Sequence, residues 1–122
     1  MTAGEQNQGI KGFIAQGAQK IYNDAITIDM FCNAFVHLSD FCCDDNILVL
    51  KSKNKISHKI LFYVATLIQS DKYKFGYGKQ YRINSLERHK IILPVLYGEL
   101  DYNFMDAFIS AIQKLVIKDV VL

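Results

Sequence analysis

The chain of 122 residues has room for one domain with a single modest core. Hydrophobic residues make up 51% of the sequence and charged residues 21%, which excludes a disordered chain, and no apolar run is long enough to span a membrane. Ten Lys/Arg and two acids give residues 51–90 a net charge of +8, against −6 for the rest, which predicts one face suited to a polyanion.

Three short strands are predicted first along the chain. Ala25–Phe31 is rich in β-branched and aromatic residues, which favour strands. Asn33–Leu38, continued by Phe41–Cys43, indicates a second strand that turns near Ser39. Turn-forming residues at positions 44–46 then lead into a short buried strand, Ile47–Leu50. This part of the chain therefore predicts a small sheet with tight connections.

An amphipathic helix is predicted next. Ser57 is a suitable N-cap, and the helix ends near Ser70. The spacing of its apolar residues places them on one helical face: Ile60, Leu61, Val64, Leu67 and Ile68.

Residues 72–82, KYKFGYGKQYR, alternate basic and aromatic side chains as a strand does, with a bend at Gly76 and Gly78. A buried strand, Ile91–Leu93, is expected to follow and to end at Pro94. The segment thus predicts two further strands.

A final helix is predicted from about Asp101, which lies near its cap. Its apolar residues step by three and four, the spacing of a coiled-coil heptad, at Met105, Phe108, Ile112 and Leu115. A helix that lies on its own domain is the alternative. We expect an α+β fold, a small twisted sheet with one packed amphipathic helix, over residues 1–98, and a C-terminal helical segment over residues 99–122.

No motif for catalysis, a metal or a cofactor is present in the sequence. The three histidines have no nucleophile or acid at catalytic spacing, and the P-loop and dinucleotide fingerprints are missing. A zinc site made from Cys32, His37, Cys42 and Cys43 is disfavoured, because adjacent cysteines on a strand point to opposite faces. We therefore expect no enzyme activity, metal or cofactor; a small magnesium-dependent nuclease is the least favoured alternative.

The residue types of positions 72–82 support binding to nucleic acid. Lysine and arginine neutralise phosphates, whereas side chains with two hydrogen-bonding groups recognise base edges. A plain hairpin with a basic, solvent-exposed side is the competing interpretation. The residues predicted to contact DNA are Lys72, Lys74, Tyr77, Lys79, Gln80, Tyr81, Arg82 and Asn84.

The order of these signals resembles a target recognition domain of the DNA-specificity (S) subunit of type I restriction-modification enzymes, and is similar to specificity regions of type IIG and IIB systems. The resemblance is carried by AITIDMFCNAFVH, DDNILVLKSK, KILFYVATLIQ, KYKFGYGKQYRIN, KIILPV and DYNFMDAFISAI, in this order. The most specific part is KFxYGxxxR, then a lysine-rich segment ending in LP, then D-Y/W-x-F-M. The match covers residues 9–106.

The resemblance implies a cytoplasmic, non-catalytic module that recognises double-stranded DNA and positions methyltransferase and restriction subunits, which carry out the catalysis. It also implies that the heptad residues begin a spacer helix that docks a partner or a second recognition half, and it adds Gln19 and Lys20 as loop residues that contact DNA. This chain has one such domain with a short N-terminal part, as in a fragment or a half-subunit. A non-catalytic protein that self-associates through its C-terminal helix is the alternative.

Overall fold

The computed structural model describes residues 21–44 and 46–121, with side chains up to Lys114. This part of the chain contains helices and small antiparallel sheets, which confirms the predicted α+β class. The central sheet contains β1 (Ala25–Ile28), β2 (Ala34–His37) and β3 (Leu48–Leu50) in the order β2-β1-β3. Both neighbours pair antiparallel with β1, whose four residues are all buried.

The predicted strands are confirmed in position, but the first two are shorter than expected. β1 ends at Ile28 because the buried carboxylate of Asp29 accepts hydrogen bonds from the backbone N–H groups of Phe31 and Asn33, both at 2.9 Å. These bonds fold the chain into a tight turn in which Cys32 has a φ of +64°. In the part of the predicted second strand that follows β2, Phe41 forms an isolated bridge with Tyr22.

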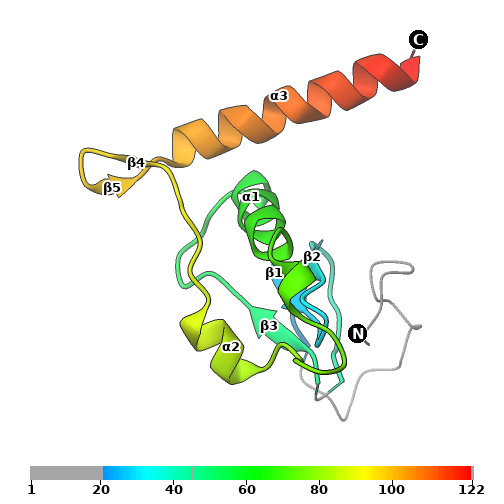
Figure 1. Cartoon of the computed structure of the whole chain (residues 1–122). Coiled ribbons are helices and arrows are strands. Elements are labelled where there is room, and N and C mark those ends of the chain that lie inside the picture. Colours follow the sequence, from blue (N-terminus) through cyan, green and yellow to red (C-terminus); the bar gives the residue numbers. More distant parts are fainter. Residues whose placement is uncertain (1–20, 45, 122) are drawn as a thin grey trace.

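Helix α1 (His58–Gln69) packs against the sheet, as its amphipathic pattern predicts. The hydroxyl oxygen of Ser57 accepts the N–H of Ile60, and Ser70 forms the C-cap, so both predicted ends are confirmed. Helix α1 lies beside the sheet (Figure 1). The two share one core, built from Ile26, Ile28, Cys32, Ala34, Val36, Leu61, Ala65, Ile68 and Tyr81.

The chain after α1 forms turns and a short helix in place of the predicted strand. Lys72–Lys74 is one turn of 3-10 helix, Gly76 and Lys79 close a tight turn, and α2 (Ile83–Arg88) follows. The prediction of a strand over residues 72–82 is therefore wrong. The alternation of basic and aromatic residues corresponds here to an exposed turn with an aromatic residue at each end. These two residues, Phe75 and Tyr81, pack inward with their ring centres 4.9 Å apart.

The prediction of a buried strand at Ile91–Leu93 is also wrong. These residues pair with no strand, and the side chain of Ile92 is 91% exposed. Pairing begins after Pro94, where β4 (Val95–Leu96) and β5 (Glu99–Leu100) form a two-stranded hairpin. Tyr97 and Gly98 form its turn, both with positive φ, a conformation that glycine adopts at little cost.

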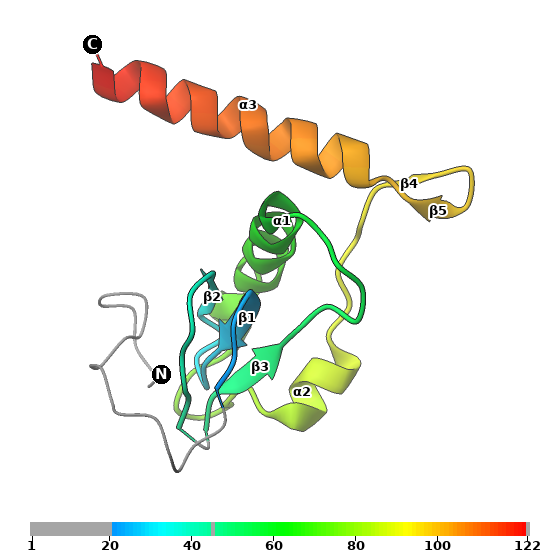
Figure 2. The same cartoon turned by 180° about the vertical axis from the view of Figure 1, so that it is seen from behind.

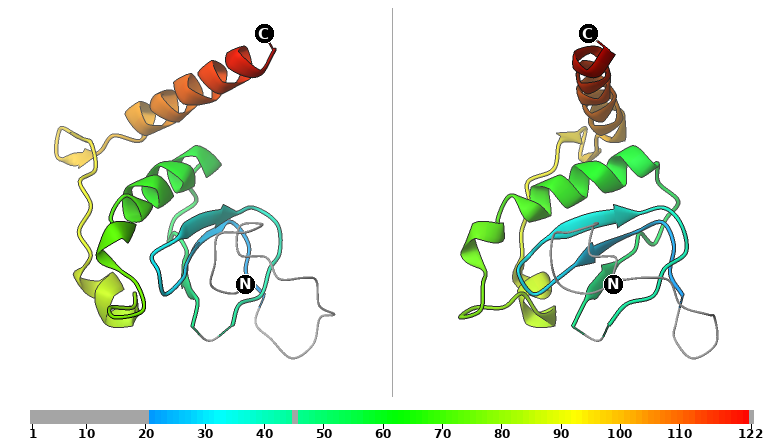
Figure 3. Two further views of the ribbon diagram at one scale, coloured as in Figure 1. Left: turned by 45° about the vertical axis from the view of Figure 1, so that its right-hand side comes forward. Right: turned by 90° about the vertical axis from the view of Figure 1, so that its right-hand side faces the viewer.

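Helix α3 (Tyr102–Val121) begins after Asp101, whose carboxylate accepts the N–H of Phe104 at 3.0 Å and so provides the predicted cap. Its first turns pack on α1 through Met105 and Ile109, both buried. Figures 2 and 3 show the resulting order of layers, with α1 between the sheet and α3.

Candidate nucleic-acid interface

Eight of the ten basic residues of positions 51–90 form two clusters, one before or at the start of α1 and one after its end. A helix of 12 residues is about 18 Å long. One cluster, Lys51, Lys53, Lys55 and Lys59, precedes or begins α1, and the other, Lys72, Lys74, Lys79 and Arg82, follows it.

The cluster before α1 is partly committed to internal contacts. The ammonium group of Lys51 donates to the backbone oxygen of Asn23 at 2.7 Å and to its side-chain oxygen at 2.8 Å. Lys59 donates to the hydroxyl of Ser110 at 2.6 Å. These two cations therefore tie β3 and α1 to neighbouring segments. In the cluster after α1, Lys74 likewise lies 3.5 Å from Asp71 and Arg82 donates to Gln80. The exposed aromatic residues Tyr73 and Tyr77 make this second cluster the stronger candidate for binding a nucleic acid.

The second cluster surrounds a tight turn, and we define residues 72–82 as the basic turn. Gly76 and Lys79 exchange two backbone hydrogen bonds, of 2.9 and 3.1 Å, which places Tyr77 at the tip with 87% of its side chain exposed. A Cβ added at Gly76 or Gly78 would meet no atom within 4 Å, and neither glycine has a positive φ. The turn itself therefore does not require glycine, but the space beside its backbone is open to a ligand.

Aromatic rings lie between the cations of the basic turn. The ammonium of Lys74 lies 5.6 Å from the ring centre of Tyr73, and that of Lys79 lies 5.5 Å from the ring centre of Phe75. Tyr77 makes an edge-to-face contact with Phe31, at 5.0 Å between ring centres. Cations and aromatic faces on one exposed surface suit the phosphates, sugars and bases of a nucleic acid.

Phe31 is a member of this surface that sequence reasoning missed. It belongs to the turn between β1 and β2, far from the basic turn in sequence, and no local pattern marks it. The two turns meet because the backbone N–H of Tyr81 donates to the carbonyl oxygen of Met30 at 2.7 Å.

Five of the predicted DNA-contacting residues have exposed side chains: Lys74, Tyr77, Lys79, Arg82 and Asn84. Lys72 and Gln80 are half-buried, and the amide oxygen of Gln80 accepts from the Arg82 guanidinium at 2.6 Å. Tyr81 does not fit its prediction as a contact residue, because its side chain is 0% exposed and fills the core. The predicted residues Gln19 and Lys20 lie outside the described residues.

A chain of hydrogen bonds supports the basic turn from within. The Tyr81 hydroxyl lies 2.9 Å from Nδ1 of His89, and Nε2 of His89 lies 2.8 Å from a carboxylate oxygen of Asp71. The hydrogen bond from His89 is the main cause that lowers the pKa of Asp71. Burial, with smaller contributions from the charges of Cys32 and Asp71, raises the pKa of Tyr81 to about 12.

The heptad residues of α3 have different environments. Met105 is 1% exposed because it packs on α1, so it is not available to a partner helix as the heptad spacing predicted. Phe108 and Ile112 are 48% and 42% exposed, and the ring of Phe108 meets Tyr63 edge to face. The Leu115 side chain lies outside the described residues.

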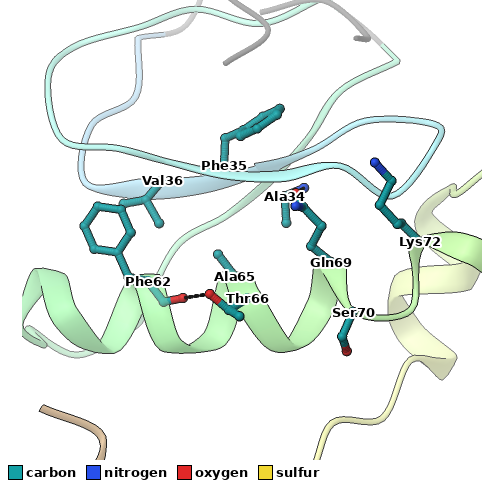
Figure 4. Close-up of a pocket in the computed structure, with 9 residues that line it drawn as sticks. All are labelled: Ala34, Phe35, Val36, Phe62, Ala65, Thr66, Gln69, Ser70 and Lys72. Atoms are coloured by element: carbon teal, nitrogen blue, oxygen red, sulfur yellow. Dashed lines mark hydrogen bonds between the residues drawn. The ribbon is translucent and has the colours of Figure 1, made fainter. Parts of the chain in front are cut away.

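A groove of about 430 Å³ lies between β2 and α1 (Figure 4). Its walls are largely apolar, and Lys72 is the charged residue among them. Among the described residues, no group of three or more His, Cys, Asp or Glu could hold a metal ion. No helix in the same residues is long and apolar enough to cross a membrane.

Comparison with known protein families matches residues 1–121 to the family described as Type I restriction modification DNA specificity domain. A search of curated proteins and a search of solved structures found no significant match.

Proposed function

Because the chain belongs to the family of type I restriction-modification DNA specificity domains, we propose that it contacts duplex DNA through the basic turn and catalyses no reaction itself. The observation that carries this proposal is the exposed turn with Tyr77 at its tip and Lys74 and Lys79 beside it. It lies where two turns distant in sequence meet, next to the central sheet.

The exposed side chains divide by chemistry into two roles. Lys74, Lys79 and Arg82 neutralise phosphates and fix the position of the domain on the duplex. Tyr77 and Asn84 are exposed residues of the turn and of α2 that can reach sugars or base edges. Tyr81 supports this surface from the core. In a full complex, the domain positions methyltransferase and restriction subunits in the cytoplasm, and those subunits supply the catalysis.

DNA binding by the purified chain tests the proposal. Fluorescence anisotropy with a labelled duplex pool of random sequence, measured over a salt series, is expected to show binding that weakens steeply with salt. Lys79→Ala is expected to weaken binding and to lower the salt slope by about 1. Lys53→Ala, at the other end of α1, is the matched control and is expected to change neither. Equal losses for the two variants would contradict the assignment to the basic turn, and no binding by the wild type would contradict the function.

Self-association is a second candidate function, favoured by a stripe of exposed apolar side chains along α3: Phe104, Phe108 and Ile112. Light scattering over a range of concentrations distinguishes the two candidates. A mass that rises with concentration and falls in Ile112→Glu, without any response to DNA, would favour self-association. A constant mass together with DNA binding would favour the first proposal.

A further inference from the structure

Resting on the proposed function, we propose that Asp71, His89 and Tyr81 form a positioning clasp that holds the basic turn in the conformation that meets DNA. Asp71 lies between α1 and the basic turn, Tyr81 lies near the end of the basic turn, and His89 follows α2. Two hydrogen bonds, of 2.8 and 2.9 Å, connect the three side chains. The clasp therefore joins both ends of the basic turn to the segment that leaves α2.

The donors and acceptors of the clasp are matched along the whole chain of three side chains. The Asp71 carboxylate only accepts hydrogen bonds, so Nε2 of His89 donates to it. Nδ1 of the ring and the Tyr81 hydroxyl form the second hydrogen bond, and the hydroxyl can serve as its donor or its acceptor. The pKa of Tyr81, raised to about 12, keeps this hydroxyl protonated at neutral pH. Each polar group thus has a partner, and the ring of His89 has a single orientation.

The basic turn depends on contacts at its ends. Within the turn, the two backbone bonds between Gly76 and Lys79 do not connect it to the sheet. The connection comes from Tyr81, through its backbone bond to Met30 and its ring contact with Phe75 at 4.9 Å. At the other end, Asp71 also lies 3.5 Å from the ammonium of Lys74. The clasp links these two anchors. Because the ring contact of Tyr77 with Phe31 holds only the tip, loss of the clasp would loosen the ends of the turn and shift Lys74 and Lys79.

The Asp–His–Tyr order also occurs in relays that activate a nucleophile, but this one cannot serve that role. The Tyr81 side chain is 0% exposed, so no substrate can reach its oxygen. Burial also raises its pKa to about 12, which opposes formation of the phenolate. The three residues position the turn and do not react.

Tyr81→Phe tests the clasp because it keeps the ring and removes the hydroxyl. The matched control is Thr27→Val, which removes another buried hydrogen bond, the one between Thr27 Oγ1 and His37 Nε2 at 2.9 Å, within the sheet. With random-sequence duplex DNA and the full chain, Tyr81→Phe is expected to bind about tenfold more weakly, with a salt slope lower by about 1, since cations are displaced. Thr27→Val is expected to retain the wild-type affinity and slope.

A second pair of variants separates positioning from a general loss of structure. His89→Ala removes the link, whereas the amide of His89→Gln supplies one donor and one acceptor in its place. We expect His89→Gln to recover most of the affinity that His89→Ala loses, and hydrogen exchange at the Gly76 and Lys79 amides to speed up in His89→Ala alone. Equal affinities for the two His89 variants would overturn the clasp, and so would wild-type affinity and salt slope in Tyr81→Phe. In both cases, DNA binding by the wild type would still support the proposed function. Absence of wild-type binding would overturn both.

Discussion

Replacement of Met105 by alanine tests whether α3 is a packed part of this domain or a helix that waits for a partner. Met105 is 1% exposed and lies, with Ile109, against α1. Polar contacts support the same interface, since Ser57 donates to a carboxylate oxygen of Asp106 and Lys59 donates to Ser110, both at 2.6 Å. The interface therefore has an apolar centre with hydrogen bonds beside it.

The expected loss follows from the burial of the Met105 side chain. Alanine lacks its outer methylene, sulfur and methyl groups, and each such group contributes about 0.8 kcal/mol when buried. A cavity adds to this loss unless the helices move together, so Met105→Ala is expected to reduce the free energy of unfolding by about 2–4 kcal/mol. Ile112→Ala is the control on the same helix. Its side chain is 42% exposed, so we expect a loss of about 0.5–1 kcal/mol, mainly from partial burial.

Urea denaturation, followed by circular dichroism, gives the free energy of unfolding of both variants and of the wild type. The slope of this free energy against urea concentration should be equal in the three proteins. Hydrogen exchange along α3 then locates the change, because a helix released from α1 loses protection before the sheet does. A free energy for Met105→Ala within about 0.5 kcal/mol of that for Ile112→Ala, near the usual scatter of surface substitutions, would refute the packing of α3 on α1.

Two further predictions concern the chain's surface and its core. Ile92→Ser is expected to change the free energy of unfolding by no more than about 0.5 kcal/mol, since the side chain is 91% exposed. A loss above about 2 kcal/mol in urea denaturation would instead support a buried strand at Ile91–Leu93. Stability is expected to fall as pH rises from about 9 to 12, because burial raises the pKa of Cys32 to about 11 and of Tyr81 to about 12, so the unfolded chain releases these protons first. In Tyr81→Phe the fall between pH 10 and 11 should be shallower by up to about 1.4 kcal/mol per pH unit; equal slopes in the two proteins would contradict this origin.

Several elements could be predicted because their causes are local. Helix α1 has a capping serine, Ser57, and apolar residues at helical spacing, and both features act within a few residues of one another. The β-branched residues of β1 favour a strand in the same way. Asp101 caps α3 through its own side chain. The family resemblance rested on the order of such segments, and the match over residues 1–121 confirms it.

The region that carries the candidate site was predicted less well, because its conformation depends on distant partners. The alternation of basic and aromatic residues in 72–82 predicted a strand. A strand also requires a neighbouring backbone that pairs with it, and no sequence pattern shows whether one is present. Here the N–H of Tyr81 bonds to Met30 in the turn after β1, and its ring enters the core. Burial of Tyr81 and the approach of Phe31 to Tyr77 both follow from this contact.

By itself, the sequence determined the fold class, the main helix, the concentration of positive charge in residues 51–90 and the family. Only the tertiary structure decided that this charge lies at two ends of α1, that Tyr81 supports the basic turn from the core, and that Met105 packs on α1. The physical reason is that propensity, capping and periodicity act over a few residues. Burial and hydrogen-bond pairing are settled by segments that the chain brings together only when it folds.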